Sequence, residues 1–159
     1  MNENITFYQS QIRNVKVGKN VTIVEPVNLY DCTIGDDVFI GPFTEIQSNV
    51  NIGNNTRISS HSFICSGVTI GEHCFIGHGV MFVNDKYDSN TTTTGKCGAI
   101  ENCICKDIDI GKCVRIGSNS TILPVSINDN VVIGAGSVVT RNVDTNCVVC
   151  GNPAKILVK

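Results

Sequence analysis

The residues best suited to chemistry lie beside a break in an otherwise regular sequence. Asn84 and Asp85 stand in a polar stretch, residues 81–98, that interrupts a repeat of aliphatic residues. A carboxylate accepts protons, and a carboxamide both donates and accepts hydrogen bonds. All three histidines of the chain precede the break, and His61 and His78 are the two candidates among them; imidazole is the side chain that changes its charge nearest to neutral pH. Proton transfer and polar binding at the break are therefore the first chemistry to consider.

The repeat that must position these residues has a period of six. Isoleucine recurs at eight consecutive sixth positions and Phe82 occupies the ninth: Ile34, Ile40, Ile46, Ile52, Ile58, Ile64, Ile70 and Ile76. A period of six keeps no single face of a helix apolar, but it contains the period of two of a strand. Glycine often follows the isoleucine and permits turn conformations that other residues resist. Each hexapeptide therefore predicts one short strand and one turn.

Three such hexapeptides close a triangular coil of about 18 residues, and stacked coils pair each strand with the strand one coil away at about 4.8 Å. The isoleucines then form ladders inside the coil and supply most of the hydrophobic burial. The period begins near Val17, resumes after the break at Ile104, and continues with a one-residue slip to Val139. The sequence predicts an all-β fold, a parallel β-helix in a single domain over residues 1–159.

This hexapeptide pattern resembles that of the left-handed β-helix acyltransferases. The run from Ile133 to Leu157, which contains IGAGSVVTRNV and VVCGNPAKIL, is similar to the closing coil of acetyl-CoA-dependent members. The run ISSHSFICSGVTIGEHCFIGHGVMFVNDKYD is similar to N-acetyltransferases of nucleotide-linked 3-amino sugars, which carry Phe-x-Asn-Asp where the repeats break. The resemblance implies a left-handed hand, an active-site loop over about residues 83–103 and a closing segment over residues 142–159.

The implied reaction is the attack of a neutral amine on the thioester carbonyl of acetyl-CoA. It needs an acceptor for the amine proton, a fixed approach and hydrogen-bond donors for the developing oxyanion. Asp85 and His61 are the candidate acceptors or orienting groups, and Asn84 is the candidate partner of the amine or the sugar. The expected further substrate contacts are His78, Lys86 and Tyr87.

Coenzyme A requires a long groove, and the stacked turns of a β-helix offer one. Small residues at turns let the pantetheine arm approach closely, cations suit its phosphates, and a proline suits its adenine. The expected cofactor contacts are Gly79, Gly117, Ser118, Ala135, Gly136, Arg141, Pro153 and Lys155. Backbone N–H groups near Gly77 and Gly79 are candidate oxyanion donors.

The sequence departs from the resembling family at two places. Tyr87 is followed by Asp88 and Ser89 where the family commonly continues with Pro-Arg, and Leu-Pro-Val at residues 123–125 is one residue shorter than the family's Leu-Pro-Gly-Val. A 4-amino sugar, a dTDP or a UDP carrier, and O-acetylation of a sugar hydroxyl remain alternatives. The hydroxyl would call for a histidine base at the break, where this chain has Asn84 and Asp85.

Composition and the resemblance together define the expected partners. A net charge of −2, with 16% charged residues, predicts no nucleic-acid or membrane partner. The nine cysteines have neither a second ligand pair nor a redox context, so we expect reduced thiols and no metal. The N-terminal sequence has no signal-peptide character, so we expect a cytoplasmic protein. The resemblance implies a homotrimer with active sites between subunits.

Overall fold

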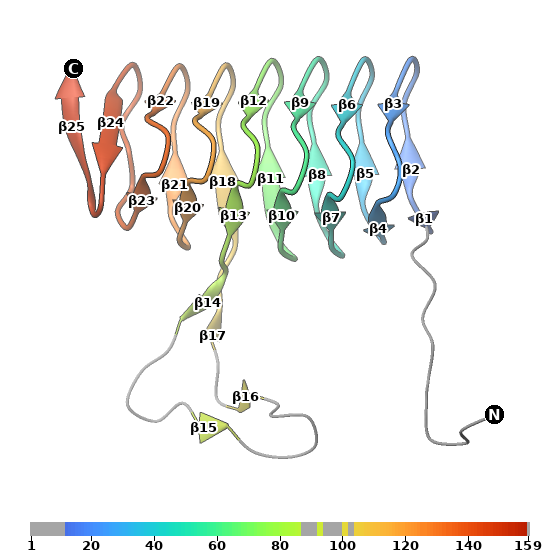
Figure 1. Ribbon diagram of the computed structural model, residues 1–159, viewed down its shortest axis with the longest axis horizontal. Helices are drawn as coiled ribbons and strands as arrows, with labels where there is room; N and C mark the ends of the chain where they lie inside the picture. The colour runs from blue at the N-terminus through green and yellow to red at the C-terminus, as the bar shows by residue number, and fades with distance from the viewer. Residues whose placement is uncertain (1–11, 87–91, 94–99, 102–103, 159) are drawn as a thin grey trace.

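The computed structural model describes residues 12–86, 92–93, 100–101 and 104–158. Three sheets, parallel except for the antiparallel last strand of one, form the sides of a prism whose coils succeed one another along its long axis (Figure 1). Within the described residues there is no helix, and so none of the length and apolarity that crossing a bilayer requires. We name the three sheets A, B and C in the order in which the chain first enters them.

Most strands are only two or three residues long. Sheet A contains β1 (Ile12–Arg13), β4 (Asn28–Tyr30), β7 (Glu45–Ile46), β10 (Phe63–Ile64), β13 (Met81–Phe82), β20 (Thr121–Ile122) and β23 (Val138–Val139). Sheet B contains β2 (Lys16–Val17), β5 (Thr33–Ile34), β8 (Asn51–Ile52), β11 (Val68–Ile70), β18 (Ile108–Ile110) and β21 (Ser126–Ile127). Sheet C contains β3 (Thr22–Ile23), β6 (Phe39–Ile40), β9 (Arg57–Ile58), β12 (Phe75–Ile76), β19 (Arg115–Ile116), β22 (Val132–Ile133), β24 (Val148–Gly151) and β25 (Ala154–Val158).

The isoleucine ladders predicted from the sequence are confirmed. In sheet B, Ile34 pairs with Ile52 and Ile52 with Ile70, each 18 residues further along the chain. These side chains are buried, as are the corresponding residues of sheets A and C. Because all three sheets turn one apolar ladder inward, the core is a single column along the prism axis. The chain is a left-handed parallel β-helix of hexapeptide repeats with one extruded loop.

The coils of the β-helix resume after the loop later than the sequence predicted. Ile70 pairs with Ile110, so β18 continues sheet B directly above β11. Ile104 lies in β17 (Ile104–Cys105), which pairs antiparallel with β14 (Asp85–Lys86). The prediction that Ile104 is an internal rung is therefore wrong. Its spacing of six from Ile110 matches the period, but sheet pairing across the insertion decides the register.

The extruded loop begins as a two-stranded extension of the prism. Figure 1 shows β14 and β17 projecting from the body beside β13, with the short antiparallel pair β15 (Thr92–Thr93) and β16 (Ile100–Glu101) beyond them. Both ends of the insertion return to the same edge of the prism, so the coils below and above it remain paired. The insertion therefore leaves the coil register intact.

Three corners join the sheets, and each has one column of left-handed backbone. The CA corner leads from sheet C to sheet A and comprises residues 24–27, 41–44, 59–62, 77–80, 117–120 and 134–137. The AB corner leads from sheet A to sheet B and includes residues 47–50, 65–67 and the loop base at 83–84. At most left-handed positions the residue is Asn, Asp or Gly, which tolerate a positive φ best.

Several cysteines serve as small core residues. Cys32 and Cys74 are buried in the ladder column, as their spacing predicted. Burial raises the pKa of each of these thiols to about 11, so both stay protonated and unreactive at neutral pH. Every cysteine among the described residues is a free thiol.

Candidate active site

A ladder of hydroxyl groups fixes the backbone of the CA corner. The hydroxyl of Ser62 donates to the carbonyl oxygens of Ser59 at 3.0 Å and of Gly77, in the next coil, at 3.1 Å. Ser120 repeats the pattern with Gly117 and Gly134, at 2.8 and 3.1 Å. Buried polar groups are costly unless they are hydrogen-bonded, so these bonds hold the turns of successive coils in register. The outer side of this corner is consequently a preorganised surface.

Two imidazoles lie on this surface in adjacent coils. His78 places Nδ1 2.8 Å from the Ser60 hydroxyl oxygen, and its backbone N–H donates to the hydroxyl oxygen of Ser118 at 3.2 Å. His61 is exposed, as its corner position predicted, and its ring stacks on Phe43 with 4.8 Å between the ring centroids. Because adjacent coils lie about 4.8 Å apart, the structure brings His61 and His78 together at one corner.

Five of the residues predicted to bind the cofactor share the CA corner with these histidines: Gly79, Gly117, Ser118, Ala135 and Gly136. Coil packing alone explains the glycine at position 117, because a Cβ there would collide with the backbone of Ala135 in the next coil. At Gly136, in contrast, φ is +68° and a Cβ would meet nothing. The outer surface of the last coils is therefore open to a ligand at Gly136.

The backbone N–H groups suggested as oxyanion donors are already engaged. The N–H of Gly77 donates to the carbonyl oxygen of Ile116 at 2.8 Å, and that of Gly79 donates to the carbonyl oxygen of Ser60 at 3.0 Å. Both bonds join neighbouring coils and belong to the ladder that holds the prism together. An oxyanion at this corner must therefore take its hydrogen bonds from other groups.

Asn84 closes the base of the extruded loop. Its side-chain Nδ2 donates to the carbonyl oxygen of Ser66 at 2.8 Å and to the Ser66 hydroxyl oxygen at 3.2 Å. The backbone carbonyl oxygen of Asn84 accepts a hydrogen bond from the backbone N–H of Lys106, on the returning side of the loop, at 3.1 Å. Asn84 is buried, so its amide joins the outgoing chain to the coil below it.

Asp85 is the first residue of the loop's outgoing strand, β14. It is half-buried, and the Cys105 thiol on β17 donates to its Oδ1 at 3.7 Å. Burial raises the pKa of the neighbouring Cys65 thiol to about 11, so this group is a neutral neighbour of the carboxylate. Lys86 follows in β14, where only its backbone is described, and Tyr87 lies outside the described residues.

Within one chain the two groups of candidate residues are apart. His61 and His78 lie at the CA corner, where the chain enters sheet A, whereas Asn84 and Asp85 lie at the AB corner, where it leaves. Between His78 and Asn84 the chain completes the CA corner at Gly79, whose φ is +65°, and then runs through β13 across sheet A. One prism therefore presents the two groups of candidate residues on opposite edges of sheet A, and we call each group a candidate half-site.

The C-terminal hairpin brings two of the predicted cofactor residues together. Arg141 and Lys155 line a hollow of about 290 Å³ with an apolar lining that includes Val149 and Ile156. Pro153 is exposed in the turn between β24 and β25. The hollow is also lined by the carboxylate of Asp144, so two cations, one anion and an apolar surface meet there; the cations suit phosphate groups.

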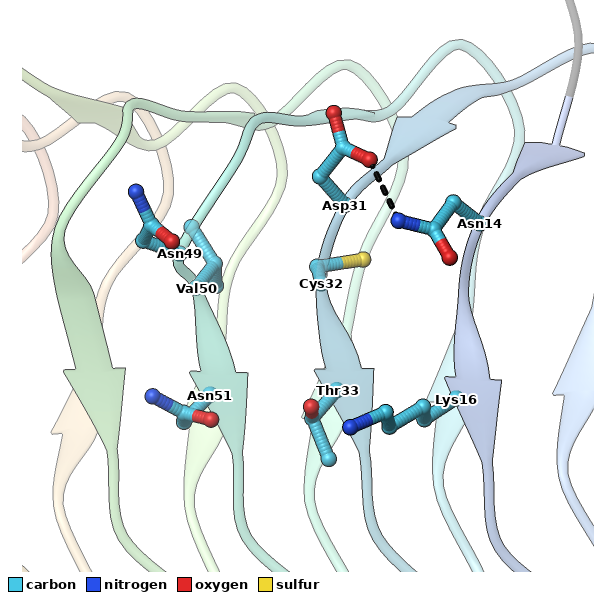
Figure 2. Close-up of a pocket in the computed structure, with 8 residues that line it drawn as sticks. All are labelled: Asn14, Lys16, Asp31, Cys32, Thr33, Asn49, Val50 and Asn51. Atoms are coloured by element: carbon cyan, nitrogen blue, oxygen red, sulfur yellow. Dashed lines mark hydrogen bonds between the residues drawn. The ribbon is translucent and has the colours of Figure 1, made fainter.

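A second hollow, of about 350 Å³, lies on the first coils and contains none of the predicted residues. Figure 2 shows it on the outer side of sheet B. There Nδ2 of Asn14 donates a hydrogen bond to Oδ1 of Asp31, in the adjacent coil, at 2.7 Å. Lys16 points along the same surface toward Thr33. Among the described residues no cluster of His, Cys, Asp or Glu has the arrangement of a metal site.

Sequence reasoning missed three residues that the coil stacking places under the predicted ones. Ser60 lies 18 residues before His78, Ser66 lies 18 before Asn84, and Phe43 lies 18 before His61. The period itself carried this signal, because residues one coil apart share a column.

Family models and sequence relatives match the repeats. The bacterial transferase hexapeptide model matches residues 31–66, and the hexapeptide repeat of succinyl-transferase matches residues 67–81 and 108–141. Galactoside O-acetyltransferase of Escherichia coli is 49% identical over 51 residues, which are 31% of this chain and 25% of that protein. The chain thus matches about a quarter of the length of this curated relative.

Solved structures resemble the chain over more of its length. A variant of AntD, an N-acyltransferase from Bacillus cereus in complex with dTDP and coenzyme A, has a TM-score of 0.81 and 25% identity, over 89% of this chain and 82% of that one. A hexapeptide-repeat acetyltransferase of Vibrio cholerae, in complex with acetyl-CoA, has a TM-score of 0.68 and 28% identity, over 78% and 68%.

The loop of the present chain falls between the two matched parts of the second model, at residues 82–107. The hexapeptide models together cover more than half of the 159 residues, and the coils they describe are those in which sheets A, B and C pair rung by rung. The chain belongs to the bacterial hexapeptide-repeat transferase family.

Proposed function

We propose that the protein is an acetyl-CoA-dependent N-acetyltransferase that acetylates the amino group of a nucleotide-linked 3-amino-deoxy sugar, for glycan or surface-polysaccharide synthesis. The observation that carries this proposal is the CA corner, where two imidazoles and a row of small residues lie along one open edge. AntD, a structural neighbour, is an N-acyltransferase that binds dTDP and coenzyme A. The Vibrio cholerae neighbour binds acetyl-CoA.

The proposed chemistry is direct acyl transfer. The amine nitrogen attacks the thioester carbonyl carbon, the carbon–sulfur bond breaks, and the sulfur leaves as the coenzyme A thiolate. Asp85 or His61 accepts the proton that the amine loses, and that proton then neutralises the thiolate. His78, held by Ser60, orients the acceptor, while Asn84 keeps Asp85 in place by closing the loop base. Positioning of the two substrates supplies much of the rate.

On this proposal, coenzyme A lies along the last coils. Its pantetheine arm passes Ser118, Ala135 and Gly136, and its phosphates meet Arg141 and Lys155 at the C-terminal hollow. The acceptor approaches from the N-terminal side of the same corner. The two substrates therefore meet near the coil that holds His78 and Gly79.

We propose further that three chains assemble and that each site lies between two of them. The two half-sites on one chain lie on opposite edges of sheet A, so on this proposal a neighbouring prism supplies Asp85 to a given CA corner. The outer side of sheet B is polar throughout: Lys16, Thr33, Asn51, Thr69, Asp109 and Ser126. Sheets C and A, on either side of the CA corner, expose Phe75 and Met81, which favours these faces for contact.

Replacing Phe75 with glutamate should break the trimer. Phe75 is 42% exposed on the outer side of sheet C, between Arg57 and Arg115, so a carboxylate there costs an isolated chain little but is unfavourable where a second chain covers it. Light scattering after size exclusion should give a trimer mass for the native protein and a smaller mass for Phe75→Glu. Thr69→Glu, on the polar face, is the matched control and should stay trimeric. A Phe75→Glu protein of unchanged mass would remove this face from the interface.

The reaction is tested by following thiol release from acetyl-CoA. The acceptors should be dTDP- and UDP-linked sugars with an amine at C3, an amine at C4, or hydroxyls only, with acetyl-CoA alone as the control. We expect turnover with one of the 3-amino sugars and a product that contains an amide. Turnover with the unmodified sugar alone would instead establish O-acetylation, the alternative that the similarity to galactoside O-acetyltransferase favours.

A further inference from the structure

Phe43 has a backbone conformation that its side chain disfavours. Its φ is +59°, in the left-handed region that Asn, Asp and Gly tolerate and that bulky residues avoid. The next two left-handed positions along the CA corner hold His61 and Gly79, and most others in the chain hold Asn or Asp. Strained residues of this kind concentrate at ligand-binding sites. Asparagine would fit the position better than phenylalanine does.

The packing of the chain does not explain the aromatic ring. Phe43 is 58% exposed and makes no part of the buried core. Its ring stacks on the exposed ring of His61, with an angle of 28° between the planes. In the preceding coil the column continues to Pro26, whose carbonyl oxygen accepts the backbone N–H of Phe43 at 2.6 Å. The strained position therefore holds an aromatic ring that faces solvent and adds nothing to the buried core.

A hollow of about 250 Å³ adjoins this ring. Its lining is Pro26, Val27, Asn28, Phe43, Thr44 and Glu45. Asn28 and Glu45 are paired in register on β4 and β7, and Glu45 Oε1 accepts a hydrogen bond from Gln47 Nε2 at 3.0 Å. The hollow therefore combines an aromatic wall with a carboxamide, which donates and accepts, and a carboxylate, which accepts. A planar heterocycle with N–H and C=O groups on its edge matches all three.

We propose that Phe43 stacks on the base of a nucleoside diphosphate, whose edge is bound by Asn28 and Glu45; this rests on the proposed function, because that nucleotide carries the amino sugar. Two coils separate Phe43 from Gly79, a distance of about 10 Å along the corner. A ribose and two phosphates span such a gap. The sugar amine then reaches the coil of His78, where the thioester is proposed to lie.

The decisive variant is Phe43→Asn, because a structural role and a binding role predict opposite results. Asparagine suits the left-handed backbone, so the free energy of unfolding should stay the same or rise. The Kd for UDP or dTDP, measured by isothermal titration calorimetry, should rise about 5- to 150-fold, as expected for the loss of one base–aromatic stack. Phe43→Tyr should keep the native affinity, since the ring face is retained.

His73→Asn is the matched control. His73 has a φ of +59° at the corner between sheets B and C, is exposed, and touches none of the proposed site. This variant also places asparagine at a left-handed backbone position that an aromatic residue held, but away from the proposed site. The nucleotide affinity should therefore not change. An equal loss of affinity in His73→Asn and Phe43→Asn would trace the effect to the coil backbone and overturn the proposal.

Other outcomes separate this inference from the proposed function. If the native protein binds neither UDP nor dTDP, or if Phe43→Asn binds both as well as the native protein does, the inference fails even where acetyl transfer proceeds. Dissociation of Phe43→Asn into single chains would also overturn it, because the ring would then pack on a second copy. Nucleotide binding that depends on Phe43, without turnover of any amino sugar, would retain the inference and refute the proposed reaction.

Discussion

The Asp85→Asn variant is expected to lose on the order of 10²- to 10⁴-fold in kcat, the usual contribution of a side chain that moves a proton in the transition state. Asparagine keeps the shape of the side chain and can accept the hydrogen bond from the Cys105 thiol, but it cannot take a proton. KM for acetyl-CoA should change little, because the proposed coenzyme A contacts lie at other residues. Steady-state assays of thiol release measure both constants.

Asp107→Asn is the control for this substitution. Asp107 is exposed at the same corner of the prism, one coil above Gly67, and has no place in the proposed chemistry. Its kcat should equal that of the native protein. If Asp85→Asn also retains kcat within about twofold, proton acceptance by Asp85 is refuted, and placement of the substrates must account for the rate.

Complementation between chains extends the same experiment. Asp85→Asn and His78→Ala each inactivate one half-site, and the half-sites lie on different corners of a chain. If a working site takes one half from each of two neighbouring chains, mixed trimers contain some sites in which both halves are native. Co-refolding the two variants should therefore restore measurable turnover. No recovery in a mixture shown to contain mixed trimers would place both groups in one chain and contradict the shared site.

The Ile70→Ala variant should lower the free energy of unfolding by about 2–5 kcal/mol, the usual cost of truncating a large aliphatic residue in a core. Ile70 is 1% exposed and lies between Ile52 and Ile110 in the sheet B ladder. Its two neighbours cannot collapse into the space, since sheet pairing holds them at fixed positions. Denaturant unfolding at one fixed protein concentration measures the change, because assembly also contributes to stability.

Thr69→Ala controls for the position in the same strand. Thr69 points outward beside Ile70 and pairs with Asn51 and Asp109, so its truncation should change the free energy of unfolding by less than about 0.5 kcal/mol. Because Ile110 is 40 residues from Ile70 in the sequence, a small effect of Ile70→Ala would contradict continuity of the core across the extruded loop. Equal effects of the two variants would contradict the assignment of inward and outward sides.

The fold was accessible from the sequence because one physical signal repeats. Each isoleucine alone is ambiguous, but the same spacing from Ile34 to Phe82 leaves only a coiled arrangement of short strands. The error at Ile104 arose because pattern and pairing disagree there. Residues within the insertion obey local antiparallel pairing, which a period of six does not encode.

The candidate site was less accessible, since it depends on which corner each residue occupies. His78 and Asn84 are six residues apart and look like neighbours in the sequence, yet one strand of sheet A places them on different edges. The role of Asn84 depends on Ser66, and the strain at Phe43 depends on a φ angle. Neither a hydrogen-bond partner one coil away nor a backbone angle follows from residue type alone.

The even spacing of the coils limits how such a protein can change its specificity. Along the CA corner, every coil advances the surface by one strand spacing of about 4.8 Å, and the hydroxyl ladder of Ser62 and Ser120 holds that advance constant. The prism therefore spaces the binding positions along this corner in steps of one coil. A longer or shorter acceptor needs a whole coil added or removed, whereas substitutions at Phe43 or His78 change only which chemical group is recognised at that position.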